Sequence, residues 1–415
     1  MTGLLIAAIL FPVAGCVVGR RSLPEVYLFG LGVVGAAMFV FGVLHVPFTV
    51  VMAAVVVAGL LGFLVAEPTG NAVTRQPGNL AKLAAIIPLL LIAIPAAIVP
   101  LNDFDGRGFW LLKAKALAHE RTISGPFFHN EIVDDPRNQY PLLLPLDAAA
   151  VMMIAGDDDD RQVRALYFFT FAAFVLYVSR RINPWCAAVL AWTPQFLVSN
   201  EGGVLTAYSD IAIAAFVTCA FFELLDGKSP LRFGAWLSFL LLTKNEGLPI
   251  AIVLGVAGIV SFRREIIRSV APAAIAAIAL FAWRSGIPKT DEEDYLRLLP
   301  TLPSRLNRLG PAIFESSKHF FAVSSWGLVW IAVWIALAIL IWRNEWRAPA
   351  VVISICAIYL GAYITTNWVM RELVDASADR LLMHVIGPAL FAISRATDVI
   401  AQNRYSPPAR QPIPV

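Results

Sequence analysis

Long apolar stretches separated by short polar connectors fill most of the 415-residue chain. A helix needs about 20 predominantly apolar residues to cross the hydrocarbon core of a bilayer, and windows of that length predict about thirteen transmembrane helices. Only a helical bundle satisfies the backbone of so many crossings in lipid. The predicted spans are 3–19, 26–45, 48–66, 82–100, 162–179, 184–199, 206–225, 231–244, 246–262, 267–284, 324–342, 348–366 and 380–396.

One polar segment, 101–139, interrupts the apolar pattern between two predicted spans. Its acids, bases and aromatic residues make it the first place to look for chemistry. Within it, Phe109–His119 is predicted to form an amphipathic helix on the membrane surface, from which Lys113 and Lys115 would reach toward phosphate. The next stretch, Tyr140–Gly156, is too short to cross the membrane comfortably and is predicted to be a juxtamembrane or re-entrant helix.

The composition supports a polytopic membrane protein. The chain is 59% hydrophobic with a mean hydropathy of +0.73, which exceeds what a water-soluble core requires. The formal net charge is +3, and the basic residues cluster at the ends of the predicted spans. This distribution indicates how the spans are oriented in the membrane and does not point to a nucleic-acid partner. The four cysteines lie in apolar stretches without metal-ligand spacing, which argues against a disulfide framework or a cysteine metal site.

The distribution of arginine and lysine predicts the orientation of the spans. Basic pairs such as Arg180–Arg181 and Arg263–Arg264 fall on one side of the alternating spans, together with the C-terminal tail. The other side receives the polar segment 101–139, the loop 285–322 and most of the acids. By the positive-inside rule this second side is predicted to be the outer face of a plasma (inner) membrane.

Ionisable residues near or within the apolar stretches are costly there, so they are candidates for function. Glu201 lies in a short outer connector, Asp210 lies early in a predicted span, and Lys244 and Glu246 separate two apolar runs. A structural salt bridge of Lys244 with Glu246 or Asp210 is the alternative interpretation.

Five fragments follow one another in an order that resembles the GT-C superfamily of integral-membrane glycosyltransferases. They are D-x-x-x-x-W-x-x-K-A-K from Asp105, YPLLLPL from Tyr140, Y-x-D ending at Asp210, T-K-N-E-G from Thr243, and SADRLLMHVIGPALF from Ser377. The resemblance extends from Leu83 to Ser394 and is nearest to the bacterial family-39-like group, which is related to protein O-mannosyltransferases and aminoarabinose transferases. It predicts an all-α, GT-C-like bundle divided into an extra N-terminal module at 1–81, a transferase core at 82–396 and a disordered tail at 397–415.

The resemblance also implies an inverting transfer of sugar from a polyprenyl-phosphate donor to an acceptor on the outer face. An aspartate of the first outer loop would act as the general base, and Asp105 matches that position, with Asp103 as the alternative. The donor phosphate would bind positive charge, and the acids would bind sugar, acceptor or a divalent cation, for which the spacing fixes no geometry. The substrate-binding candidates are Lys113, Lys115, Tyr140, Glu201, Asp210, Lys244, Glu246 and Arg380.

Two alternatives share the same bundle and the same buried charges. A transporter or flippase would move a lipid-linked sugar without forming a glycosidic bond, although the sequence has no evident inverted repeat. An inactive scaffold would keep the fold without the chemistry. The expected partners are the polyprenyl-phosphate sugar, membrane lipids and a glycan, lipid or protein acceptor.

Overall fold

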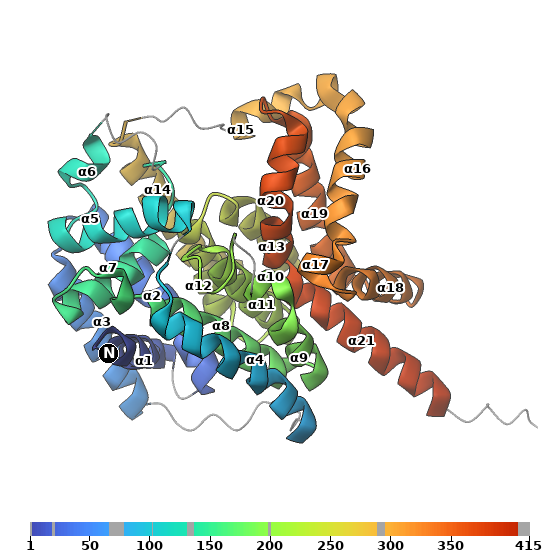
Figure 1. Cartoon of the computed structure of the whole chain (residues 1–415), viewed down its shortest axis with the longest axis horizontal. Coiled ribbons are helices and arrows are strands. Elements are labelled where there is room, and N and C mark those ends of the chain that lie inside the picture. The colour runs from blue at the N-terminus through green and yellow to red at the C-terminus, as the bar shows by residue number, and fades with distance from the viewer. Residues whose placement is uncertain are drawn as a thin grey trace, which may run out of the picture.

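A computed structural model of the chain describes residues 2–18, 21–65, 79–101, 103–130, 137–197, 201–288 and 295–405. Every regular element in these ranges is a helix, which confirms the prediction of an all-helical membrane protein (Figure 1). The acidic pair at 134–135, the basic residues at 20 and 75, and the tail from 406 onward lie outside the described residues.

The first half of the chain forms the helices from α1 to α10. Their bounds are α1 Thr2–Gly15, η1 Cys16–Val18, α2 Leu23–Val43, α3 Phe48–Val65, α4 Asn79–Ile98, η2 Gly106–Leu111, α5 Leu112–Glu120, α6 Pro126–His129, α7 Leu143–Ala155, η3 Asp160–Gln162, α8 Arg164–Arg181, α9 Pro184–Trp192 and α10 Pro194–Leu197.

The second half continues the bundle and ends in two long helices. Their bounds are α11 Asp210–Asp226, α12 Pro230–Thr243, α13 Gly247–Ser261, α14 Ile266–Ser285, α15 Tyr295–Leu298, η4 Leu299–Thr301, η5 Pro303–Arg308, α16 Leu309–Phe320, α17 Val323–Trp326, α18 Val329–Trp342, α19 Arg347–Thr365, α20 Met370–His384 and α21 Ile386–Tyr405. Helix α21 therefore makes the first part of the expected tail, 397–405, helical.

Among the described residues, six helices are long and apolar enough to cross a membrane, or seven if the bent pair α20–α21 is one span. The six are Leu23–Val43, Phe48–Val65, Asn79–Ile98, Asp160–Arg181, Ile266–Ser285 and Arg347–Thr365. Five shorter apolar helices are Thr2–Val18, Leu143–Ala155, Pro230–Thr243, Gly247–Ser261 and Val329–Trp342. Four of them fall in expected spans, and Leu143–Ala155 falls in the stretch expected to be juxtamembrane or re-entrant. The larger number of spans expected from hydropathy is not confirmed.

Breaks in the helices explain part of this difference. The expected span 184–199 is interrupted at Thr193, because the proline at 194 starts a new short helix. The expected span 324–342 is interrupted at Gly327, whose φ of 56° ends α17. The bounds expected for the last span, 380–396, are wrong, because the chain bends by 56° between α20 and α21.

Helix α5, which was expected on the membrane surface, packs inside the molecule instead, and α7, which was expected to be juxtamembrane or re-entrant, is also enclosed by protein. Helix α5 is packed against α7, and its Ala114 and Leu117 are fully buried. Helix α7 is buried along most of its length, between α5 and α2. The apolar residues of the polar segment therefore cover protein, and the prediction of an amphipathic helix lying on lipid is wrong in this respect.

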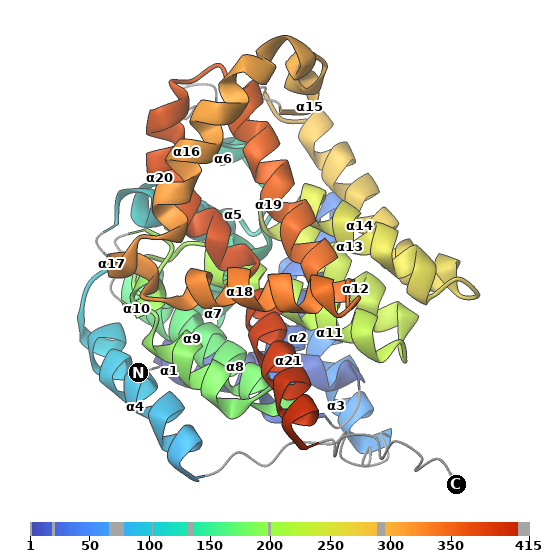
Figure 2. The same ribbon diagram turned by 90° about the vertical axis from the view of Figure 1, so that its right-hand side faces the viewer.

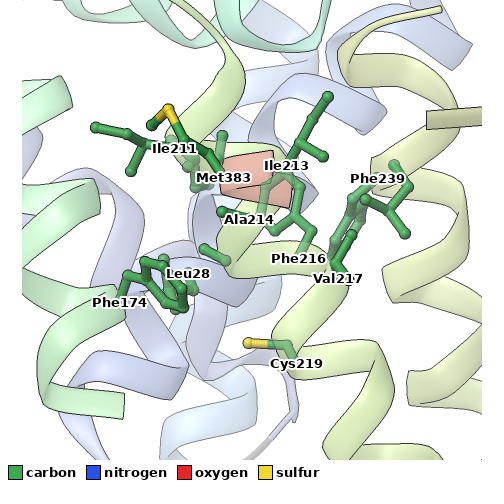
Figure 3. Close-up of a cluster of buried hydrophobic side chains, with 14 of the residues drawn as sticks. Leu28, Phe174, Ile211, Ile213, Ala214, Phe216, Val217, Cys219, Phe239 and Met383 are labelled. Carbon is green, nitrogen blue, oxygen red and sulfur yellow. The ribbon is translucent and has the colours of Figure 1, made fainter. Parts of the chain in front are cut away.

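The centre of the apolar core is α11, in which nearly every side chain is buried. Figure 3 shows Ile211, Ala214 and Phe216 of α11 among Leu28 of α2 and Met383 of α20. Because elements from the first, middle and last parts of the sequence meet there, α11 is held in place from several sides. The polar residue at its start, Asp210, is held in place with it.

The ends of the helices lie at two opposite sides of the bundle. Figures 1 and 2 both place α5, α6, α15 and the start of α20 toward one end, and the start of α4 and the last turns of α21 toward the other. The helices of the polar segment, α5 and α6, thus lie toward the same end as α15.

Close contact between α1 and α2 depends on glycines. A Cβ added at Gly30 would collide with the backbone oxygen of Phe11, and one at Gly15 would collide with that of Val26. Small residues let the backbones of membrane helices approach closely, so that dispersion contacts hold them together. Helices α1 and α2 also contact α7 and α8, so the N-terminal helices pack directly on the rest of the bundle.

We predict that Gly30→Ala lowers the free energy of unfolding by about 1–3 kcal/mol, because the added methyl group forces α1 and α2 apart. Gly361→Ala is the matched control, since a Cβ at this position of α19 meets nothing within 4 Å. Thermal unfolding of the detergent-solubilised protein measures both effects. Equal melting temperatures for the two variants would contradict the proposed contact.

Candidate functional site

Four ionisable residues, Asp210, Lys244, Glu246 and His384, form a network that we call the inner cluster; the first, second and fourth are buried, and Glu246 is partly exposed. Lys244 Nζ donates to Asp210 Oδ1 at 3.0 Å and lies 3.1 Å from Glu246 Oε1. His384 Nε2 lies 2.8 Å from the same Asp210 oxygen. The sequence left open whether Lys244 pairs with Asp210 or with Glu246, and the structure places it against both.

Helix ends bring the inner cluster together. Asp210 is the first residue of α11, where the positive end of the helix dipole favours a carboxylate. Lys244 and Glu246 lie in the break between α12 and α13, and His384 is the last residue of α20. Backbone breaks inside a membrane protein occur where the chain is enclosed by protein or lines a polar region.

His384 and its second partner were not among the residues that sequence reasoning selected. The hydroxyl of Tyr359 on α19 lies 2.8 Å from His384 Nδ1, and both side chains are buried. The only signal for His384 in the sequence was a histidine within an apolar stretch of a fragment selected for its resemblance. Tyr359 carried no signal, because tyrosines are common in membrane helices for other reasons.

A second group, the outer cluster, consists of Asp103, Asp105, Glu201, Tyr208 and Arg380. Arg380 Nη1 lies 3.9 Å from Asp105 Oδ2, and Arg380 Nε lies 3.6 Å from Glu201 Oε2. The guanidinium carbon of Arg380 is 5.2 Å from the centre of the Tyr208 ring, within the range of a cation–π contact. The arginine is therefore held between two carboxylates and an aromatic face by contacts longer than hydrogen bonds.

A tight local structure places Asp105. Asp103 Oδ1 accepts a hydrogen bond from the backbone N–H of Gly106 at 3.0 Å, and Asp105 precedes the π-helix η2. A Cβ at Gly106 would collide with the carbonyl oxygen of Thr206, so only glycine lets η2 approach the connector before α11 this closely. Short π-helical segments often occur at functional sites.

Exposure increases from the inner cluster to the outer cluster. The side chain of Asp210 is 0% exposed and that of Arg380 is 17% exposed, whereas Asp105 and Glu201 are 35% and 50% exposed. Partial burial raises the pKa of Glu201, and the nearby Asp103 and Asp105 add to this while Arg380 opposes it. The outer cluster is thus the part that a substrate can reach, and the inner cluster lies behind it.

An aromatic group of Phe109, Trp110, Tyr140 and Tyr208 borders the outer cluster. Lys113 is fully buried beneath it, with Nζ 4.1 Å from the centre of the Phe109 ring and 2.6 Å from the carbonyl oxygen of Arg137. Tyr140 lies beside Phe109, with the two ring centres 5.2 Å apart, and Lys113 Nζ is 5.7 Å from the centre of the Tyr140 ring. Lys113 and Tyr140 therefore form part of the aromatic wall that borders the outer cluster.

Lys115 lies apart from the other candidates. Its Nζ forms an ion pair of 2.8 Å with Asp160 Oδ1, and the other oxygen of that carboxylate, Oδ2, lies 3.5 Å from Arg107 Nε. Positions two apart on a helix point to different sides, which explains why Lys113 and Lys115 have different surroundings. Of the ten site residues predicted from the sequence, seven belong to the two clusters: Asp103, Asp105, Glu201, Asp210, Lys244, Glu246 and Arg380.

Within the described residues, no three His, Cys, Asp or Glu side chains converge in a way that could hold a metal ion. Comparison of the chain with protein-family models, with curated proteins and with solved structures finds no match.

A further polar group holds α20 from its other side. His319 of α16 lies 3.3 Å from Asp379 and 3.5 Å from Asp375. Asp379 also accepts hydrogen bonds from Ser325 and from the indole N–H of Trp326. Asp379 directly precedes Arg380, so these contacts help to fix the helix that carries the arginine of the outer cluster.

We predict that the contribution of His319 to stability is largest at mildly acid pH. The hydrogen bond to Asp379 raises the pKa of His319, so the folded protein binds the proton more tightly than the unfolded chain. The stabilisation is complete below the unfolded pKa of about 6.5 and is lost as the pH rises through the folded pKa.

The measurement is the difference in melting temperature between wild type and His319→Gln at pH 6 and at pH 9. The difference should correspond to at most about 1 kcal/mol, as for other partly exposed pairs, and should shrink at pH 9. Lys318→Gln removes the neighbouring pair with Glu315 and should show no such change with pH. A difference for His319→Gln that grows toward pH 9 would refute the ion pair.

Proposed function

We propose that this chain is a GT-C-like membrane glycosyltransferase that moves a sugar from a polyprenyl-phosphate donor to an acceptor hydroxyl. The observation that carries the proposal is the placement of Asp105 of the polar segment against Arg380 of α20, at 3.9 Å. This arrangement offers a carboxylate for the acceptor and a guanidinium for the donor phosphate at one partly exposed place.

Asp105 acts as the general base in this proposal. The acceptor hydroxyl attacks the anomeric carbon, and the bond between that carbon and the phosphate oxygen breaks. The polyprenyl phosphate leaves with the bonding electrons, and the hydroxyl proton passes to the carboxylate of Asp105. The phosphate is a weakly basic leaving group, so no separate acid is needed. Glu201 and Asp103 border the same space and bind the sugar or the acceptor.

Arg380 is the best phosphate ligand among the four cationic candidates. Lys244 already pairs with two carboxylates, Lys115 pairs with Asp160, and Lys113 is buried and donates to a backbone oxygen. The contacts of Arg380 with Asp105 and Glu201 are longer than hydrogen bonds, so its guanidinium can turn toward a phosphate and bind it in a bidentate way.

The distribution of basic residues favours the outer face of a plasma membrane for this chemistry. Helices α5, α6 and α15 lie toward one end of the bundle, and the C-terminal end of α21 lies toward the other (Figure 2). A polyprenyl donor would keep its isoprenoid tail in the bilayer and present its phosphate at this end. Exposed apolar side chains of the spans would face the lipid.

A transporter of a lipid-linked sugar is a second candidate, favoured by one observation. The pair α20–α21 is bent by 56° beside the ionisable His384, and discontinuous helices with polar groups at the break occur at the binding sites of transporters. Purified protein in vesicles distinguishes the two functions. A transferase forms a glycosidic bond, whereas a transporter moves the intact donor across the bilayer.

We predict that Asp105→Asn reduces sugar transfer about 10²- to 10⁴-fold, since the amide cannot accept the hydroxyl proton. The melting temperature should stay near that of wild type, because Asp105 is partly exposed. Asp103→Asn should reduce transfer less. The measurement is the formation of labelled glycoside by purified protein. If Asp103→Asn abolishes transfer and Asp105→Asn leaves it intact, the two aspartates have the opposite roles.

We predict that Arg380→Ala weakens binding of the polyprenyl-phosphate sugar much more than binding of the acceptor. Loss of a charged hydrogen-bonding partner corresponds to about 1.5–3 kcal/mol, or roughly 10- to 150-fold in affinity. Arg395→Ala is the matched control. Arg395 lies on α21, outside both clusters, and its guanidinium pairs with Glu345 in the connector between α18 and α19. If the protein uses a soluble nucleotide sugar and ignores the lipid donor, the donor assignment is wrong.

A further inference from the structure

His384 joins three helices at the bend of the last span. It is fully buried at the end of α20, where the chain turns by 56° into α21. One ring nitrogen lies 2.8 Å from Tyr359 on α19, and the other lies 2.8 Å from Asp210 at the start of α11. Both polar atoms of the imidazole are therefore used, and each is used by a different helix.

The partners define the direction of one hydrogen bond. An ionised carboxylate only accepts, so the Nε2–H of His384 donates to Asp210. Nδ1 can then accept from the hydroxyl of Tyr359, which is free to rotate toward it. A neutral imidazole in this single tautomer satisfies both partners. Asp210 in turn holds Lys244, so the bend is connected to the break between α12 and α13.

The register of α20 relates this contact to the outer cluster. Arg380 and His384 are four residues apart on one helix, so their side chains lie on the same face. Beside them, a Cβ at Gly202 would lie 3.1 Å from Met383 Sδ and 3.2 Å from Arg380 Cγ. The connector that carries Glu201 thus packs tightly on the same turn of α20, and a rotation of α20 would move Arg380 away from Asp105.

We propose that His384 is a positioning residue that holds α20 in the rotation at which Arg380 faces Asp105 and Glu201. His384 does not touch the substrate and acts through Asp210 and the bend. The part of this inference that concerns donor binding rests on the proposed transferase function. The part that concerns the position of α20 does not depend on it.

Two substitutions separate positioning from simple packing. His384→Phe keeps the approximate volume and removes both hydrogen bonds, whereas His384→Gln can place an amide N–H where Nε2 lies and keep the bond to Asp210. For His384→Phe we expect KM for the polyprenyl-phosphate sugar to rise about 10- to 100-fold, with a smaller change in kcat. His384→Gln should restore most of this loss.

Tyr363→Phe is the matched control. Its hydroxyl also joins α19 to α20, through Ser377 at 3.0 Å, but it does not contact the inner cluster. It should leave KM unchanged. Equal KM values for wild type, His384→Phe and Tyr363→Phe would overturn the proposal, and so would a loss in His384→Phe that His384→Gln does not restore.

A second measurement reports on the helix itself. Spin labels at Arg371→Cys on α20 and Arg268→Cys on α14, both exposed positions, are introduced into a variant whose four native cysteines are replaced by alanine. Their distance distribution should shift or broaden in His384→Phe and return in His384→Gln. An unchanged distribution would refute the positioning role. If wild type does not turn over the lipid donor, the transferase function fails, and the label distances still test His384.

Discussion

The pairing of the buried carboxylate of Asp210 is the interaction on which the arrangement of this molecule depends. A charge in a low-dielectric interior is costly unless opposite charges and hydrogen bonds surround it. Lys244 and His384 provide these partners from elements 34 and 174 residues away. The four helices α11, α12, α13 and α20 must therefore meet at one point, and removing one partner would leave another charge unpaired.

Close backbone contacts make that meeting possible. Glycine at position 106 lets η2 reach the connector before α11, and glycine at 202 lets the same connector pack on α20. Gly202 has a φ of +81°, a conformation that other residues rarely adopt. The outer cluster is thus assembled by two glycines that permit approach and one arginine that attracts carboxylates from both sides. Its chemistry and its backbone geometry depend on each other.

The sequence predicted those helices that correspond to a single uninterrupted run of apolar residues. The windows for α2, α3, α4, α14 and α19 agree closely with the observed helices, because an uninterrupted apolar run forms one helix. The prediction was wrong where apolar residues cover protein, as in α5. Hydropathy measures aversion to water and does not distinguish lipid from a protein interior. It also missed the bend before α21, although Gly387 and Pro388 stand at the start of that helix and a proline removes a backbone hydrogen bond to the preceding turn.

The sequence by itself determined the class of the protein and most of the charged residues of the site. Membrane character follows from composition, and Asp210, Lys244, Glu246 and Arg380 stand out because ionisable groups are rare in apolar stretches. Only the tertiary structure decided how these charges pair, that Lys115 belongs to a separate ion pair, and that His384 and Tyr359 complete the network. The physical reason is that the cost of a buried charge is visible locally, whereas its partner is chosen by contacts between helices far apart in the chain.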